Sequence, residues 1–396
     1  MPRTRPVPDE GDLIHSLHQQ AQWLSAKIGP ASVLKLGIGD DCALLRPRPG
    51  EDIVVTTDFS LESIHFRREW HSPESAGHRC LARGLSDLAA MGAHPMAAFL
   101  SLALPAELVR TSRGSSSWRD RFLAGLLRLA EVWRVPLAGG DTAQSPVCPD
   151  MREHRFGLAL ADIVLVGSVP RGRALLRSGA KAGDLLYVTG YLGGAAAELH
   201  QLAHRRRSAR IFMPPNPGSI NPHPHLFPEP RLGVGQWLVK QRRATAAMDI
   251  SDGLSTDLDR LCRASRLAAV VEASSIPIHP LATRPTTWPE RALGESNGSR
   301  RDVGSSGRHK ISQTGETSQE SLRLALHGGD DYELLFTAPA DTRLPRRIAG
   351  VPIACIGQMR AHRTGTPRMV LADTSNGKRR EQPLPPQGWE HFRAPQ

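Results

Sequence analysis

Short apolar runs and helical repeats alternate along the chain, and this alternation predicts an α/β fold. The β-branched run at 53–58 predicts a strand. Leu81, Leu85 and Leu88 then recur at the spacing of one helical face, behind an N-cap, a proline and an acidic first turn at 72–74. Further strands are predicted at 96–104, 135–138, 158–166, 185–189, 244–250, 332–337, 353–357 and 369–372. Further helices are predicted at 122–133, 193–200 and 254–261.

The pattern groups into two α/β units, with a boundary predicted near 145–155. Residues 1–29 are expected to form an extension and a first helix, 30–150 an N-terminal domain and 151–396 a C-terminal domain. Two segments of the second unit, 204–230 and 289–319, are rich in Arg and Pro or in Ser, Gly and charge, with little that could be buried. Both are predicted to be mobile insertions.

The uncharged stretch 88–106 is about long enough to span a bilayer, but the turn signal at 92–95 interrupts it. We therefore expect the end of a helix, a turn and a buried strand. Asp9, Glu10 and Asp12 stand where a signal peptide would need its apolar core. The 5 cysteines are scattered and never spaced Cys-x-x-Cys, which favours reduced thiols. These features predict a soluble cytoplasmic protein with no membrane segment.

The formal charge of +11 comes largely from short basic clusters at 204–207, 300–301 and 378–380. Such clusters are typical of solvated loops, although a positive field can also steer small anions inward. Aromatic residues make up only 5% of the chain, and no nucleic-acid-binding module is recognisable. Nucleic-acid binding is therefore not expected.

Acidic residues recur at turns that directly follow short apolar strands. These positions are Asp40, Asp41, Asp58, Asp141, Asp249, Asp252, Asp330 and Asp331. Because strand ends converge in α/β folds, such carboxylates would repel one another unless cations lie among them. Oxygen ligands indicate a hard cation, and Mg²⁺ is the natural one where phosphates complete the coordination. Asp87 lies on a helix, about 100° or more from the leucine stripe, and Thr56 and Thr57 offer neutral ligands.

The pairs Gly139-Gly140 and Gly328-Gly329 precede acids and would let a phosphate approach the backbone, or simply form tight turns. The basic stretch 173–181 is either a solvated turn or a phosphate clamp. Phosphate-loop, dinucleotide-binding, protein-kinase, zinc-helix and serine-hydrolase motifs are absent from the sequence. A nucleotide would therefore have to be bound through metal ions.

Seven stretches taken together resemble the thiamine-monophosphate kinase family, in family order and across roughly 30–390 apart from the two insertions. They lie at 36–45, 56–66, 85–93, 138–142, 172–181, 248–254 and 328–334. The resemblance implies a two-domain fold like that of aminoimidazole ribonucleotide synthetase, with mixed sheets flanked by helices. It also implies a homodimer formed through the N-terminal domain, which would bind ATP and Mg²⁺.

Site residues follow from the resemblance position by position. The implied Mg²⁺ ligands are Asp41, Thr56, Thr57, Asp58, Asp87, Asp141, Asp249 and Asp252. The implied ATP contacts are Gly140, Asp141, Arg177 and Ser251, and the implied thiamine monophosphate contacts are His65, Asp330 and Trp389. Asp330 stands where the family usually has Glu, and Ala124 where a Tyr often lines the ATP site. Between Asp40 and Asp41 the choice of ligand rests on spacing alone.

The implied activity is ATP-dependent phosphorylation of thiamine monophosphate to thiamine diphosphate, within thiamine diphosphate biosynthesis. Because the acceptor is already an anionic phosphate, we expect direct in-line transfer with several Mg²⁺ ions and neither a general base nor a covalent nucleophile. One alternative is a synthetase of the aminoimidazole ribonucleotide or selenophosphate type, although no cysteine precedes Cys42 to serve selenophosphate chemistry. Another is a basic nucleic-acid-binding protein with a vestigial nucleotide site.

Overall fold

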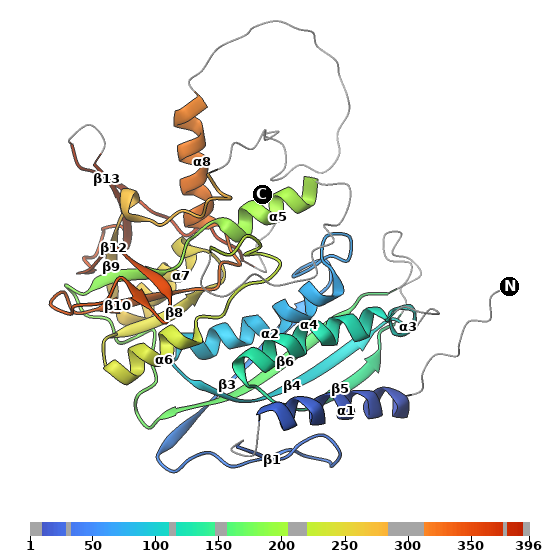
Figure 1. The fold of residues 1–396 in the computed structure, drawn as a ribbon. Coiled ribbons are helices and arrows are strands. Elements are labelled where there is room, and N and C mark those ends of the chain that lie inside the picture. The colour runs from blue at the N-terminus through green and yellow to red at the C-terminus, as the bar shows by residue number, and fades with distance from the viewer. Residues whose placement is uncertain are drawn as a thin grey trace, which may run out of the picture.

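The computed structural model describes residues 10–28, 33–110, 116–146, 157–204, 220–283, 313–374 and 378–390. It contains two α/β units, each built on its own sheet (Figure 1). The N-terminal unit, blue to green, lies below the C-terminal one, which runs from green to red. This arrangement confirms the predicted α/β class with mixed sheets flanked by helices.

The N-terminal unit is built on a four-stranded mixed sheet in the order β3-β6-β4-β5. Its strands are β3 (Glu51–Leu61), β4 (His94–Leu104), β5 (Leu137–Gln144) and β6 (Leu160–Pro170). β6 pairs antiparallel with both β3 and β4, whereas β4 and β5 are parallel. The predicted boundary at 145–155 therefore falls within the β5–β6 connection, and the first sheet is completed only at residue 170.

Helices α2 (Pro73–Ala90) and α4 (Trp118–Trp133) cover one face of this sheet (Figure 1). The predicted start of α2 is confirmed, since the Ser72 side chain accepts a hydrogen bond from the Ser75 amide at 3.1 Å and Pro73 opens the first turn. The predicted leucine stripe is fully buried. A Cβ on Gly77 would lie 1.9 Å from the Phe122 carbonyl oxygen, so only glycine lets α2 and α4 approach this closely. Helix α1 (Glu10–Ile28) packs along β5 and α4.

The C-terminal unit holds an eight-stranded sheet in the order β14-β13-β9-β12-β7-β10-β8, with β11 (Arg347–Ile348) paired to β12. The other strands are β7 (Leu185–Thr189), β8 (Ala246–Ile250), β9 (Leu267–Glu272), β10 (Glu333–Ala338), β12 (Val351–Ala361), β13 (Met369–Asp373) and β14 (Arg380–Pro383). Its helices are α5 (Gly194–His204), α6 (Leu232–Gln241), α7 (Leu254–Ser265) and α8 (Gln313–His327). Small elements complete the described chain: β1 (Leu34–Leu36), β2 (Leu44–Leu45), α3 (Ala106–Val109) and the 3-10 turn η1 (Ala273–Ser275).

The structure describes only part of each segment that was predicted to be a mobile insertion. Residues 205–219 and 284–312 lie outside the described residues, but 220–230 is packed into the molecule, with His225, Leu226 and Phe227 buried. The proline-rich composition of this part therefore conceals a short apolar anchor. Residues 313–319 begin helix α8 rather than continue a loop.

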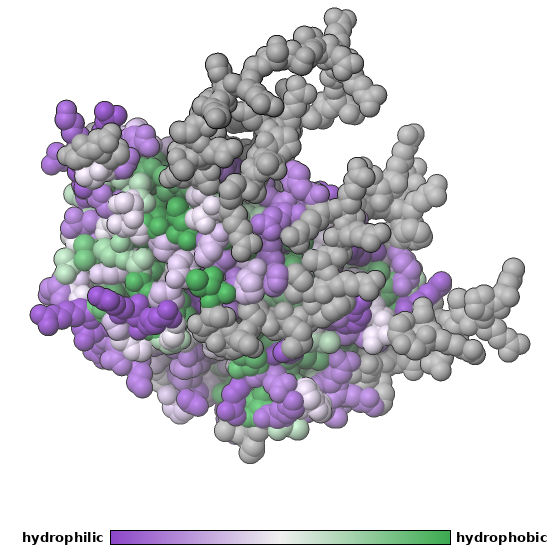
Figure 2. Space-filling model, turned by 45° about the horizontal axis from the view of Figure 1, so that its top comes forward, coloured by the Kyte–Doolittle hydropathy of each residue, from purple (hydrophilic) through white to green (hydrophobic). Residues whose placement is uncertain are grey.

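The stretch 88–106 forms the end of α2, a turn and strand β4, as predicted. No helix among the described residues is long and apolar enough to cross a membrane. The face drawn in Figure 2 is a mosaic in which green apolar patches are interrupted by purple hydrophilic residues. Cys42, Cys80, Cys262 and Cys355 are free thiols, while Cys148 lies outside the described residues.

Candidate active site

A cleft of about 1050 Å³ lies beside β4 and β5, beneath the loop 37–43 and Leu17 of α1. It brings together Asp41, Gly140 and Asp141, three of the residues predicted for metal or ATP. Asp40 lines it as well, so the geometry leaves the choice between Asp40 and Asp41 open. A Cβ on Gly140 would lie 1.8 Å from the Leu100 carbonyl oxygen, so glycine is required where β5 passes β4.

Asp162 extends this acidic surface across the sheet. Ser101 on β4 is paired with Asp141 of β5 on one side and with Asp162 of β6 on the other, and paired residues share a face. The Thr57 hydroxyl donates to Asp162 Oδ1 at 2.8 Å. The sequence prediction missed Asp162, and its only signal there was a charge inside an apolar strand.

The opposite, helix-covered face of β3 carries a second acidic cluster. Thr56 and Asp58 point toward α2, because side chains alternate along a strand and Thr57 therefore points away. The Thr56 hydroxyl donates to Asp87, and the Ser86 hydroxyl donates to Asp249 Oδ2 at 2.9 Å. The three predicted metal ligands on β3 thus lie on both faces of the strand rather than on one.

Negative charge in this cluster is poorly compensated. Burial, followed by the nearby Asp87 carboxylate, raises the pKa of Asp58 to about 7. Burial and Asp87 likewise raise the pKa of Asp249 well above its ordinary value. Arg83 approaches Asp58 Oδ1 at 3.5 Å, but the buried Asp58 Oδ2 accepts no hydrogen bond from any described residue. Carboxylates arranged in this way favour the binding of a cation.

The end of β8 and the residues before β10 meet at one turn. The Asp330 amide donates to the Ser251 carbonyl oxygen at 2.8 Å, and the Trp389 amide donates to that of Asp252 at 2.9 Å. The Asp252 carboxylate contacts Arg260 at 2.5 Å. Buried Asp257 accepts hydrogen bonds from the Ser251 and Asp252 amides at 3.1 and 2.9 Å and so fixes the turn. Four predicted residues, Ser251, Asp252, Asp330 and Trp389, are therefore neighbours.

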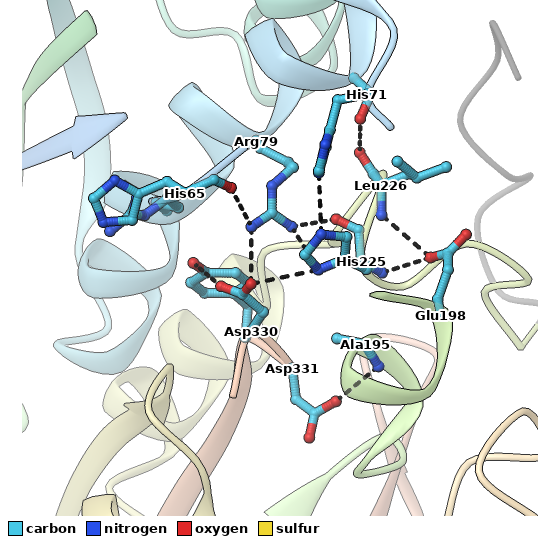
Figure 3. Close-up of polar contacts among 12 residues, drawn as sticks. His65, His71, Arg79, Ala195, Glu198, His225, Leu226, Asp330 and Asp331 are labelled. Carbon is cyan, nitrogen blue, oxygen red and sulfur yellow. Dashed lines mark hydrogen bonds and ion pairs between the residues drawn. The ribbon is translucent and has the colours of Figure 1, made fainter. Parts of the chain in front are cut away.

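Asp330 lies at the centre of a polar network (Figure 3). Its Oδ2 contacts Arg79 Nη2 at 3.0 Å and His225 Nδ1 at 3.4 Å, and its Oδ1 accepts the Tyr332 hydroxyl at 2.9 Å. Burial alone would raise the pKa of Asp330, but Arg79 and His225 outweigh burial and hold that pKa well below its ordinary value. Asp330 is therefore ionised at neutral pH.

The same network anchors the segment 220–230 and the loop before α2. Arg79 donates to the His225 carbonyl oxygen and to the His65 carbonyl oxygen, the latter at 3.4 Å. His71 Nε2 lies 3.0 Å from His225 Nε2. Burial, and then Arg79, lowers the pKa of His225. Predicted residue His65 thus joins Asp330 through Arg79, a residue that the sequence prediction did not select.

Other predicted residues lie apart from these clusters. Arg177 is exposed in the β6–β7 connection, and its carbonyl oxygen accepts a hydrogen bond from Ser265 at 2.7 Å. Ala124 is exposed on α4 and does not line the cleft. Asp331, beside Asp330, caps α5 by accepting the Gly193 amide at 2.8 Å. A second cavity, of about 410 Å³ between α4, the segment 220–234 and β12, contains none of the predicted site residues.

Comparison with known proteins identifies the family. Residues 39–169 match the model "AIR synthase related protein, N-terminal domain". The chain is 36% identical over 332 residues to the thiamine-monophosphate kinase of Escherichia coli K12, across 83% of this chain and 85% of that protein. The chain belongs to the thiamine-monophosphate kinase family. It is accordingly an enzyme, a thiamine-phosphate kinase that uses a phosphate group as acceptor.

Other thiamine-monophosphate kinases agree. The Bacillus subtilis protein is 33% identical over 290 residues, covering 72% of this chain and 80% of its own length. The crystal structure from Stenotrophomonas maltophilia K279a has 31% identity and a TM-score of 0.64, covering 88% of this chain and 94% of that one. AaThiL, solved with AMPPCP and TMP, has 24% identity, a TM-score of 0.61 and 97% coverage of both chains, and shows the shared fold.

Proposed function

We propose that this thiamine-monophosphate kinase transfers the γ-phosphoryl group of ATP directly to thiamine monophosphate, in a Mg²⁺-dependent, in-line reaction that yields thiamine diphosphate. The observation that carries the metal dependence is the partly buried cluster of Asp58, Asp87 and Asp249, whose carboxylates lie near one another with little compensation. The AaThiL structure, which contains AMPPCP and TMP, supports both substrates.

The donor set fits a hard cation. Among the described residues, no three His, Cys, Asp or Glu side chains are already arranged to hold a metal ion. However, Asp58 Oδ2 is buried without a partner there, and all the donors in the cluster are oxygens. Asp58, Asp87, Asp249 and Thr56 would hold ions on the helix side, and Asp41, Asp141 and Thr57 on the open side. Bound Mg²⁺ would screen the repulsion between two polyanions.

The reaction needs no proton acceptor. An anionic oxygen of the substrate phosphate forms a bond to the γ-phosphorus, while the bond from the γ-phosphorus to the bridging oxygen breaks and its electron pair leaves with ADP. On this proposal the cleft at Gly140 and Asp141, together with Ser251, contacts ATP, whereas Arg177 lies apart from them in the β6–β7 connection. His65, Asp330 and Trp389 contact thiamine monophosphate, where an ionised carboxylate and an indole suit the cationic thiazolium ring.

A homodimer through the N-terminal unit belongs to the same proposal. Strand β3 is an edge of its sheet, and Ile53, Val55 and Phe59 on its open face are exposed, the last two by 61% each. Exposed apolar side chains on an edge strand favour pairing with another chain. The region 30–150 would then supply the dimer contact and most of the ATP and Mg²⁺ site, with Asp249 and Ser251 added from the C-terminal unit. A cytoplasmic location stays a prediction.

The deciding experiment is an assay with ATP, MgCl₂ and thiamine monophosphate in which ADP and thiamine diphosphate are both quantified. Equimolar appearance of the two products, abolished by EDTA and restored by Mg²⁺, is expected. ADP without thiamine diphosphate would contradict the proposed acceptor, and full activity in EDTA would contradict the metal dependence.

A further inference from the structure

Helix α2 presents three charged residues along one face at intervals of four: Arg79, Arg83 and Asp87. Arg79 contacts Asp330 at the predicted thiamine monophosphate end, and Asp87 accepts the Thr56 hydroxyl at the predicted metal end. Four residues of helix advance by about 6 Å. Arg83 therefore stands between the two ends of the proposed reaction, about one helical turn from each.

The hydrogen-bonding capacity of Arg83 is mostly unused. Its side chain is only 15% exposed, and Nη1 donates to the Phe59 carbonyl oxygen at 2.6 Å. The contact of Nη2 with Asp58 Oδ1 is long, at 3.5 Å, and buried Nε finds no acceptor within the described chain. Buried guanidinium groups normally satisfy their five N–H donors, so this one is in place for an acceptor that the chain does not provide.

We propose that Arg83 is a catalytic residue that binds the phosphoryl group during transfer, between the metal-holding carboxylates and the acceptor phosphate. This inference rests on the proposed function. The migrating group spreads its charge over three equatorial oxygens, and the planar, permanently charged guanidinium matches two of them at once.

A purely structural alternative is that Arg83 only neutralises Asp58. The two roles differ in what they affect. A charge neutraliser competes with metal for Asp58, so its removal should lower the Mg²⁺ concentration needed for half-maximal rate and leave kcat nearly unchanged. A phosphoryl-binding residue acts on the transition state, so its removal should lower kcat even at saturating Mg²⁺, ATP and thiamine monophosphate.

The test compares Arg83→Gln and Arg83→Lys with a control, Arg263→Gln, at an exposed arginine of α7 outside the site. We expect Arg83→Gln to lower kcat about 100-fold, as loss of a transition-state donor does. Arg83→Lys should recover part of that loss, and Arg263→Gln should match the wild type. Binding of Mg²⁺-AMPPCP by Arg83→Gln, followed by calorimetry, should stay within about threefold of wild type, because the lost contact forms in the transition state.

The outcomes separate the inference from the function beneath it. Wild-type enzyme that makes no thiamine diphosphate would defeat the proposed function itself. Active wild type with an unchanged kcat in Arg83→Gln, and a lower Mg²⁺ requirement, would overturn the role of Arg83 alone. If Arg83→Gln does not fold, Arg83→Lys decides, since it keeps the charge. Full kcat in a folded Arg83→Lys variant would then reject the need for a planar guanidinium.

Discussion

Asp58 and Asp330 are both aspartates near α2, yet their surroundings shift their pKa values in opposite directions. Asp330 receives Arg79, His225 and Tyr332, and its pKa is held well below the ordinary value. Asp58 has one distant arginine and an oxygen without a partner among the described residues, and burial with Asp87 raises its pKa to about 7. The difference teaches that the surroundings of Asp330 are already completed by the protein, whereas those of Asp58 leave a carboxylate oxygen for a ligand, which on the proposed function is a metal ion.

The largest expected effect is the loss of turnover when Asp58, the acid with little compensating charge, is replaced. Asp58→Asn should lower kcat by about 1000-fold, because it removes a proposed metal ligand. The variant should stay folded, because the substitution also relieves the repulsion with Asp87. Asp52→Asn is the control, a half-buried acid on the same strand outside the acidic cluster, and should stay within about twofold of wild type. The measurement is thiamine diphosphate formation at saturating Mg²⁺, with thermal melting as the folding check. Equal activity in both variants would refute the contrast.

Replacing Arg79 in the Asp330 network should instead lower the free energy of unfolding. Arg79→Met leaves Asp330 and His225 without their buried cation, and breaking such a pair costs about 3–5 kcal/mol of unfolding free energy. Arg360→Met, which removes an exposed partner of Glu381, should cost less than about 1 kcal/mol. Urea unfolding of both variants measures the difference. Similar losses would mean that the Asp330 network is no more important than a surface ion pair.

The pH dependence of stability should carry the signature of Asp58. Its folded pKa of about 7 exceeds its ordinary value of 3.8, mainly through burial, so the folded state holds an extra proton between these values. In EDTA, the unfolding free energy of wild type relative to Asp58→Asn should fall by up to about 4 kcal/mol as pH rises from about 4 through 7. Saturating Mg²⁺, which would bind the ionised carboxylate, should reduce this fall in the same pH window. If the difference in unfolding free energy between the two proteins does not change across this pH range, folding does not raise the pKa of Asp58.

A smaller effect is expected on the oligomeric state, which tests whether the exposed face of β3 forms the dimer contact. Val55→Lys should shift the enzyme from dimer to monomer in light scattering, because a charge would be buried in the proposed interface. Val132→Lys is matched to it, since both valines are 61% exposed and Val132 lies on α4. A monomeric wild type, or two variants that behave alike, would count against β3 as the contact.

The smallest expected effect concerns α2, which carries residues of both ends. Ser72→Ala removes the side-chain cap of its first turn and should cost about 1 kcal/mol in chemical unfolding. Because Arg79 lies closer to the cap than Asp87, the Asp330 network should be perturbed before the metal end. Ser117→Ala, at the cap of α4, is the control that leaves α2 intact.

Patterns of local origin were predictable from the sequence. The start of α2, its buried leucine face and most strands follow from capping and periodicity, which act over a few residues. The acids at the ends of β8 and β10 were also expected to lie near one another, and these two strands are neighbours in the sheet. Helix α6 and strand β9 were missed, since their apolar positions lack clear boundaries.

Long-range features were not predictable. Asp330 and Asp331 are adjacent in sequence, yet one is held by Arg79 and the other caps α5, and nothing local distinguishes them. Arg79 and His225 meet only because segment 220–230 folds back onto α2, over 140 residues away in sequence. The alternation of faces along β3, which separates Thr57 from Asp58, could have been read from the strand pattern but was not combined with the ligand assignment.

Strand β6 is last in sequence among the strands of its sheet and second in position, between β3 and β4. During synthesis, β3 and β4 therefore leave the ribosome without the strand that joins them. Their apolar edges must wait for more than fifty residues of further translation after β4, a period in which helices α2 and α4 can already form from local contacts. Until β6 has emerged, the edges of β3 and β4 that it will join stay open to mispairing.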